Sequence, residues 1–168
     1  MPSPVGHALG GLIVGVVVGD REPGAVRPWA LALPVIAAVA PDIDFLWGRH
    51  NMETHSLGAA LLAGLAVLAW TRGRGPGLAL AVALAWSSHV LFDWLGSDTT
   101  PPLGVMALWP LSSDFYFANA FLFDAISRRT YRPDFWSHNL WAVAKEVVML
   151  APVAGAAWAL RRRPSSDR

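Results

Sequence analysis

Five apolar stretches, separated by turn-forming and polar segments, dominate the pattern of the chain. They run over residues 7–19, 28–40, 56–70, 77–95 and 140–160. Alanine and leucine are frequent in them, and Pro-Gly, Pro-Asp and glycine-rich turns bound the first four, which favours helices over strands. The pattern therefore predicts an all-α bundle of about five helices, with a long irregular or helical segment, residues 96–139, before the last one.

The lengths of these stretches bear on whether they cross a membrane. A span needs about 20 apolar residues, and only the fourth and fifth stretches reach that length. The other three are nearer to buried or half-inserted helices, unless flanking turns extend them or local thinning absorbs the mismatch. Composition favours the membrane, because 54% of the residues are apolar and only 15% are charged. We expect a multi-pass inner-membrane protein; a very apolar soluble or peripheral bundle is the alternative.

Basic residues predict how the bundle is oriented. If the helices alternate in direction, one side carries Arg21, Arg27, Arg72, Arg74, Arg161, Arg162 and Arg163. The positive-inside rule makes that side cytoplasmic, although Arg49, Arg128, Arg129 and Arg132 on the other side are a partial counterweight. We expect one membrane domain, residues 1–160, an extracytoplasmic amino terminus, and a basic cytoplasmic tail, residues 161–168.

Composition and charge exclude several classes of function. The chain has no Cys, which excludes a disulfide scaffold, thiolate metal sites and cysteine nucleophiles. A net charge of +1 gives no bulk electrostatic basis for binding nucleic acid, and no direct binding is expected. The sequence also lacks a Gly-x-Ser-x-Gly nucleophile elbow and a phosphate-binding glycine loop followed by Lys.

Histidine and carboxylate residues gather on the predicted extracytoplasmic side. Four separate helix ends supply His7, Asp42, Asp44, His50, His55, His89 and Asp93, and Glu146 lies less than two turns into the fifth stretch. His89 and Asp93 are one helical turn apart, so both point from one helix face and can share an ion. Ionisable groups are costly to bury in membrane helices, so each of them is a candidate functional residue. A shared cation would offset the cost of burying them in apolar surroundings. Nitrogen and oxygen ligands suit Zn²⁺, with Mn²⁺ or Fe²⁺ as alternatives.

Each of these residues also has a structural interpretation. His7 could be an interfacial residue near the chain terminus, and the Asp42 and Asp44 pair could be a solvated helix end. His89 and Asp93 could form a hydrogen-bonded pair without an ion. The one-sided clustering favours the metal interpretation for His89 and Asp93 together with His55.

Several short motifs occur in the order of a known family. They are Gly6-His7-Ala8, Ala40-Pro41-Asp42-Ile43-Asp44, His50-x4-His55 within RHNMETHSL, Ser88-His89-Val90-Leu91-Phe92-Asp93 and Leu108-Trp109-Pro110-Leu111-Ser112. With them the chain resembles the inner-membrane family of proposed metal-dependent hydrolases, also called LexA-binding membrane hydrolases. That family has been likened to the zinc-dependent phospholipase C superfamily, which comprises helical enzymes with a multi-zinc site.

The resemblance implies a set of metal ligands. The superfamily uses an Asp followed later by a His, then a His-x3-Asp pair and a His-x3-Glu pair. Asp42 and His55 resemble the first pair, His89 and Asp93 resemble the second, and His7 resembles an early His ligand.

Two departures from the family pattern concern the candidate site. Glu146 could stand for the final Glu, but Ala142 occupies the place of the His before it, and an interfacial ion pair with Lys145 is the alternative. Asn51 and Met52 replace the Arg and Gly of the family's His-Arg-Gly-x-Thr-His element. From these departures we expect substrate recognition to differ from the family's, and the metal site to lack one ligand of the family pattern.

The sequence favours a membrane-bound metal-dependent hydrolase that acts on a phosphoester or lipid head group through a metal-activated water. Its metal ligands would be His7, Asp42, His55, His89, Asp93 and Glu146. Asp44 or Asp42 would be the general base. Arg49, Arg128, Arg129 or Arg132 could bind a phosphate, with an ordinary interfacial role as the alternative. The non-enzymatic alternatives are a metal-binding scaffold, an ion carrier, or a membrane anchor that binds a partner through residues 96–139.

Overall fold

The computed structural model describes residues 1–19, 28–119 and 121–162. This part of the chain is all-helical, with only isolated β-bridges and no named strand. Its helices are α1 (Pro4–Val18), α2 (Pro28–Val39), the 3₁₀-helix η1 (Ala40–Trp47), α3 (Leu57–Trp70), α4 (Pro76–Trp94) and α5 (Phe135–Arg161). The predicted all-α bundle of five helices is therefore confirmed. Of the predicted cytoplasmic tail, residues 161–168, the structure describes only Arg161 and Arg162. Residues 163–168 lie outside the described part of the chain.

Local signals set the ends of the helices. Ser3 caps α1, because its hydroxyl accepts a hydrogen bond from the Gly6 N–H at 3.2 Å. Ser56 caps α3 in the same way, with the Ala59 N–H as donor at 3.0 Å. At the carboxyl end of η1, Gly48 takes a left-handed conformation with φ 70°. Serine caps and a left-handed glycine satisfy backbone groups that the helix itself leaves unpaired.

Two helix boundaries differ from the sequence expectations. The last helix begins at Phe135 rather than near residue 140, so the irregular segment is residues 96–134. The Pro41-Asp-Ile-Asp run does not stop the chain's helical path, because η1 continues it to Trp47. Both differences have one cause. Hydropathy marks only the apolar part of a helix. The helical backbone can extend further into polar surroundings, where side chains and water form hydrogen bonds with the free N–H and C=O groups at its ends.

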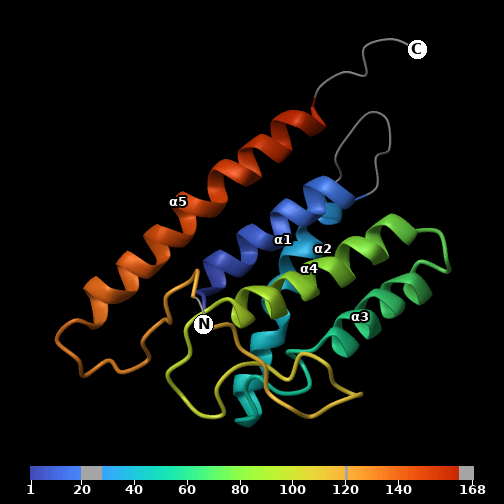
Figure 1. Ribbon diagram of the computed structural model, residues 1–168. Coiled ribbons are helices and arrows are strands. Elements are labelled where there is room, and N and C mark those ends of the chain that lie inside the picture. Colours follow the sequence, from blue (N-terminus) through green and yellow to red (C-terminus); the bar gives the residue numbers. More distant parts are fainter. Residues whose placement is uncertain (20–27, 120, 163–168) are drawn as a thin grey trace.

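The centre of the bundle is formed by α1, α2 and α4. α3 packs against α4, and α5 packs against α1 at the edge (Figure 1). The buried core where α2 meets α4 is built from small residues, among them Ala37, Ala38 and Ala85. Small side chains let helix backbones approach closely, which is how helices associate in a membrane, where no water drives them together.

Three helical segments of the described chain are long and apolar enough to cross a membrane by length and composition. They are Trp29–Trp47, Pro76–Trp94 and Phe135–Arg161. The first combines α2 with η1, which supplies the length that the second apolar stretch lacks by itself. α1 and α3, with 15 and 14 residues, stay short of the roughly 20 that a span requires.

One end of the bundle carries the irregular segment and can be called the loop end. α1, α3 and α5 begin there, and α4 and η1 end there (Figure 1). Residues 96–134 are tied to this end by backbone hydrogen bonds: the Leu57 N–H donates to the Ala107 carbonyl at 2.9 Å, and the Ala118 N–H donates to the Trp94 carbonyl, at the end of α4, at 2.9 Å. The loop end therefore collects the first or last turns of all the helices in one place.

The close approach of α1 to α2 gives a first prediction. A Cβ at Gly11 would lie 2.6 Å from both the Ala38 Cβ and the Pro34 carbonyl oxygen. We expect Gly11→Ala to lower stability by about 1–3 kcal/mol, because the two helices must separate. Thermal unfolding of the purified protein in detergent measures this.

The matched control for this variant is Gly155→Ala in α5, where nothing lies within 4 Å of the added Cβ. It should leave the melting temperature unchanged or raise it slightly, because alanine favours helix over glycine. Equal melting temperatures for the two variants would contradict the tight contact between α1 and α2.

Candidate metal centre

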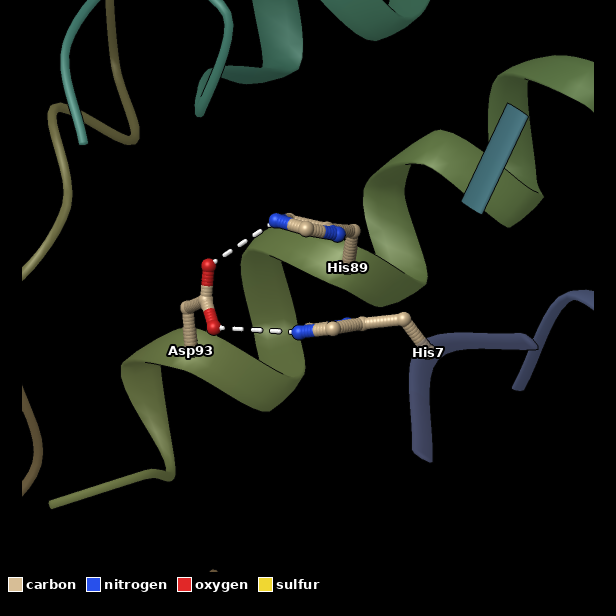
Figure 2. A group of neighbouring side chains, drawn as sticks. All are labelled: His7, His89 and Asp93. Carbon is tan, nitrogen blue, oxygen red and sulfur yellow. Dashed lines mark ion pairs between the residues drawn. The ribbon is translucent and has the colours of Figure 1, made fainter. Parts of the chain in front are cut away.

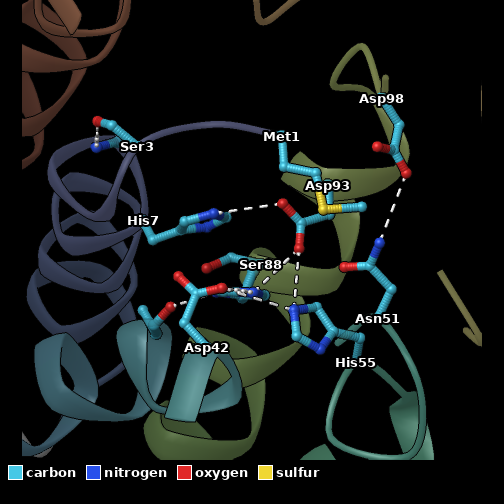
Figure 3. A network of polar contacts seen from close by, with 12 residues as sticks. Met1, Ser3, His7, Asp42, Asn51, His55, Ser88, Asp93 and Asp98 are labelled. Carbon is cyan, nitrogen blue, oxygen red and sulfur yellow. Dashed lines mark hydrogen bonds and ion pairs between the residues drawn. The ribbon is translucent and has the colours of Figure 1, made fainter. Parts of the chain in front are cut away.

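Five of the sequence-predicted ligands converge at the loop end. α1 supplies His7, η1 supplies Asp42, the turn before α3 supplies His55, and α4 supplies His89 and Asp93 (Figures 2 and 3). Four of these side chains are at most 1% exposed, whereas Asp42 is 22% exposed. We call this group the His–Asp cluster.

Asp93 is the centre of the His–Asp cluster. One carboxylate oxygen, Oδ1, lies 3.3 Å from His7 Nε2, and the other, Oδ2, lies 3.0 Å from His89 Nε2 (Figure 2). His55 Nε2 approaches Oδ2 at 3.4 Å. Three imidazole nitrogens from three chain segments thus face one buried carboxylate. The rings of His7 and His89 stack with their centroids 3.7 Å apart.

Asp42 closes the cluster on its accessible side. Its Oδ1 lies 3.7 Å from His55 Nε2 and 3.8 Å from His89 Nε2. Two ligands of one tetrahedral Zn²⁺ lie about 3.4 Å apart when each bond is about 2.1 Å. The separations in the cluster are therefore close to those that a shared ion would impose.

Orphaned polar atoms show that this donor set fits a metal ion. His55 Nε2, His89 Nε2 and both carboxylate oxygens of Asp93 are buried and have no hydrogen-bond partner. Leaving one such group unsatisfied costs about 1–3 kcal/mol. Among the described residues, His7, His89 and Asp93 form one group able to hold an ion, and Asp42, His50 and His55 form another, with ligand atoms within 4.8 Å of one another.

A second layer of hydrogen bonds orients the histidines. His89 Nδ1 lies 2.7 Å from the Ala38 carbonyl oxygen, and His55 Nδ1 lies 3.0 Å from Asp44 Oδ2. Both contacts leave Nε2 pointing into the cluster. A carbonyl or carboxylate on the far ring nitrogen is the usual support of a metal-ligating histidine.

Asp44 acts as the common support for two histidines. Its Oδ1 lies 2.9 Å from His50 Nδ1, and its Oδ2 also accepts a hydrogen bond from the Thr54 hydroxyl at 2.8 Å. The carboxylate is 1% exposed, and both of its oxygens are engaged. Its position therefore suits orienting His50 and His55 more than contacting a substrate.

His55 carries an altered pKa. Burial lowers that pKa, but the neighbouring carboxylates of Asp42 and Asp44 outweigh burial and raise it to about 9. A histidine must be neutral to ligate a metal, so binding of an ion releases a proton and weakens as the pH falls.

Glu146, the sixth predicted ligand, lies apart from the cluster. It is 1% exposed and accepts hydrogen bonds from the backbone N–H of Ser3, at 2.7 Å, and from the Ser3 hydroxyl. These bonds join α5 to the start of α1. Lys145 does not pair with Glu146 and instead contacts Asp124 at 3.1 Å.

Sequence reasoning missed two parts of the site. His50 was identified in a motif but not proposed as a ligand, although the His50-x4-His55 spacing was the available signal. The Ala38 carbonyl carries no signal, because every residue has one and only the fold brings it beside His89. His138 stays outside the cluster, with Nε2 2.8 Å from the Ala125 carbonyl oxygen.

A cavity of about 770 Å³ adjoins the cluster at the loop end. Its lining includes Asp42, His50, Arg128, Arg129 and Arg132. Asp42 and His50 therefore face both the buried groups and an accessible space. Among the five residues of the cluster, Asp42 is the one that lines this cavity.

The fold and the cluster define a helical membrane protein whose buried His and Asp residues could hold a metal ion. The chain belongs to the YdjM inner membrane protein family, whose sequence pattern matches residues 1–162. No match was found among curated proteins or among solved structures. The family assignment supports membrane localisation and adds no evidence for hydrolysis or for a likeness to phospholipase C.

Metal analysis of purified protein tests the cluster. We expect bound divalent metal in the wild type prepared with metal present, and loss of that metal in His89→Ala and Asp93→Asn, because each removes a central ligand. His138→Ala is the matched control and should keep its metal. A folded wild type without metal under these conditions, or equal metal in all four proteins, would contradict the assignment.

Proposed function

We propose that this protein is a membrane-bound metal-dependent hydrolase that acts on a phosphoester, including a lipid head group. The observation that carries the proposal is the His–Asp cluster, with its unpartnered Nε2 and carboxylate atoms, opening through Asp42 to a cavity. Most buried polar atoms in proteins have a hydrogen-bond partner, so a concentration of unpaired atoms at one point favours a bound ion over packing alone.

Zn²⁺ is the ion that we propose, with Mn²⁺ or Fe²⁺ as alternatives, because the donors are imidazole and carboxylate. His7, His55, His89 and Asp93 would hold it, with the Asp42 carboxylate beside it on the cavity side. A bound ion of this kind polarises a phosphoryl oxygen and lowers the pKa of a bound water towards about 7. Glu146 is the weakest candidate ligand, because Ser3 already occupies its carboxylate.

Asp42 suits the role of general base better than Asp44. Asp42 lines the cavity and is partly exposed, so its carboxylate can accept a proton from a water molecule there. Asp44 is buried, and both of its carboxylate oxygens are already in contact with His50, His55 and Thr54. Asp44 then acts as a positioning residue that holds His55 in the ligating orientation.

A membrane lipid is the substrate class that the surroundings support. An apolar groove of about 390 Å³ lies along α1 and α2, lined by Pro4, Val5, Ala8, Leu9, Leu12 and Val35. Pro4 also lines the polar cavity. A lipid could therefore place its acyl chain in the groove and its head group in the cavity.

The charge distribution disfavours the carrier alternative. In α1, α2, α3 and α4 the His and acidic residues lie only at the loop end, in the described part of the chain. A carrier needs polar groups along a path through the membrane. A non-enzymatic metal scaffold remains as an outcome of the activity measurement.

Hydrolysis of phosphomonoesters, phosphodiesters and phospholipids by the purified protein in nanodiscs tests the proposal. We expect metal-dependent turnover of at least one class, lowered at least about 100-fold by Asp42→Asn, because a general base contributes about 10²–10⁴. Asp114→Asn makes the same change at an exposed residue outside the cavity lining and should keep full turnover. Bound metal without hydrolysis of any class would favour the scaffold instead.

The orientation in the membrane is part of the proposal. We propose that the loop end faces the extracytoplasmic side, because Arg72 and Arg74 lie between α3 and α4 at the opposite end, and Arg161 and Arg162 lie at the end of α5. Positively charged connections favour the cytoplasmic side.

Because the chain has no Cys, single-cysteine variants report this orientation cleanly. We expect Ser113→Cys to react with a membrane-impermeant maleimide in intact spheroplasts, and Arg74→Cys to react only after permeabilisation. Protection of Ser113→Cys with labelling of Arg74→Cys would place the cluster on the cytoplasmic side.

A further inference from the structure

Arg128 lies on the wall of the cavity with its side chain held in place. Its guanidinium carbon lies 3.8 Å from the centroid of the Phe45 ring, in a cation–π contact. Its Nη2 donates to His50 Nε2 at 3.4 Å. The side chain is exposed and yet has two specific partners, so its charge is directed into the cavity.

A chain of contacts joins Arg128 to the His–Asp cluster. Because arginine can only donate, His50 accepts at Nε2 and its Nδ1 donates to Asp44, at 2.9 Å. Asp44 in turn lies 3.0 Å from His55 Nδ1. The position of the guanidinium relative to the cluster is therefore set through two residues, His50 and Asp44.

The charge of Arg128 is not neutralised by a carboxylate. Other basic side chains at the loop end are paired: Arg49 with Glu53 at 2.5 Å, Arg132 with Asp134 at 2.8 Å and Lys145 with Asp124 at 3.1 Å. Within the described part of the chain, Arg128 and its neighbour Arg129 have no ion pair, and both line the cavity. The lining also holds Asp42, Asp98, Asp124 and Asp134, but Asp124 and Asp134 are already paired with Lys145 and Arg132. The two unpaired arginines therefore remain available to an anion.

We infer that Arg128, with Arg129 beside it, binds the phosphate group of the substrate in this cavity. The inference rests on the proposed function and adds the residue that recognises the substrate. A guanidinium offers two parallel N–H groups that match two phosphate oxygens, and the contact with Phe45 holds its plane. The phosphate then lies between Arg128 and the Asp42 side of the cluster.

A soluble phosphate ester and a lipid head group both present a phosphate group to Arg128. Two probes distinguish these two kinds of ligand. Inorganic phosphate is titrated calorimetrically into protein in detergent, and binding is compared in nanodiscs of pure phosphatidylcholine and of phosphatidylcholine with phosphatidic acid. Binding of inorganic phosphate indicates a soluble ester, and a preference confined to phosphatidic acid indicates a lipid. Both results support an anion site, whereas binding of neither probe overturns it.

Arg128→Gln and Arg132→Gln form the matched pair of variants. Both arginines line the cavity, but the Arg132 charge is already taken by Asp134. We expect Arg128→Gln to weaken binding of the probe at least about tenfold, since hydrogen bonds to charged groups are among the stronger ones, and Arg132→Gln to change it little. An equal loss in both variants would mean general electrostatic attraction and would overturn the inference.

Metal content and thermal stability, measured on the same samples, separate this inference from the proposed function. Arg128→Gln should keep the metal content of the wild type, because its partners Phe45 and His50 are not members of the His–Asp cluster, and its melting temperature should fall only slightly with loss of these exposed contacts. Metal-loaded wild type that binds no phosphate probe overturns the inference alone. Wild type without metal overturns the proposed function, and the phosphate titration still decides the role of Arg128.

Discussion

The burial of the Asp93 carboxylate among three histidines is the interaction on which the rest of the structure depends. A charge in an apolar bundle is costly unless opposite charges or donors surround it. His7, His55 and His89 bring their rings within 3.4 Å of this carboxylate from three separate chain segments. The helices that carry them must therefore meet at one depth and in one register, because a shift of one turn would separate the carboxylate from the three rings.

The architecture of the bundle meets this requirement through small residues and fixed helix ends. Glycine and alanine let α1, α2 and α4 approach closely enough for His7 and His89 to stack. The irregular segment, residues 96–134, covers the loop end and bonds to the start of α3. The outcome is a buried cluster with a single partly exposed member, Asp42, which also lines the cavity.

The sequence predicted the pairing of His89 with Asp93 and the end of the bundle at which the cluster lies, but it did not distinguish the roles of Asp42 and Asp44. The i, i+4 spacing of His89 and Asp93 fixes their shared face before any fold is known. The gathering of His and acidic residues at alternate helix ends pointed to one end of the bundle. Asp44, in contrast, was indistinguishable from Asp42 as a candidate base, because two carboxylates in one short run differ only in what surrounds them.

The sequence by itself determined the all-helical class, the apolar character of the helices and most of the residues that meet in the cluster. These follow from periodicity and spacing, which are local properties of the chain. Only the tertiary structure decided that Glu146 bonds to Ser3, that His50 links Asp44 to Arg128, and that Arg128 keeps an uncompensated charge in the cavity. Such partners are far apart in the sequence, and their pairing depends on how the helices pack and on where the irregular segment folds back.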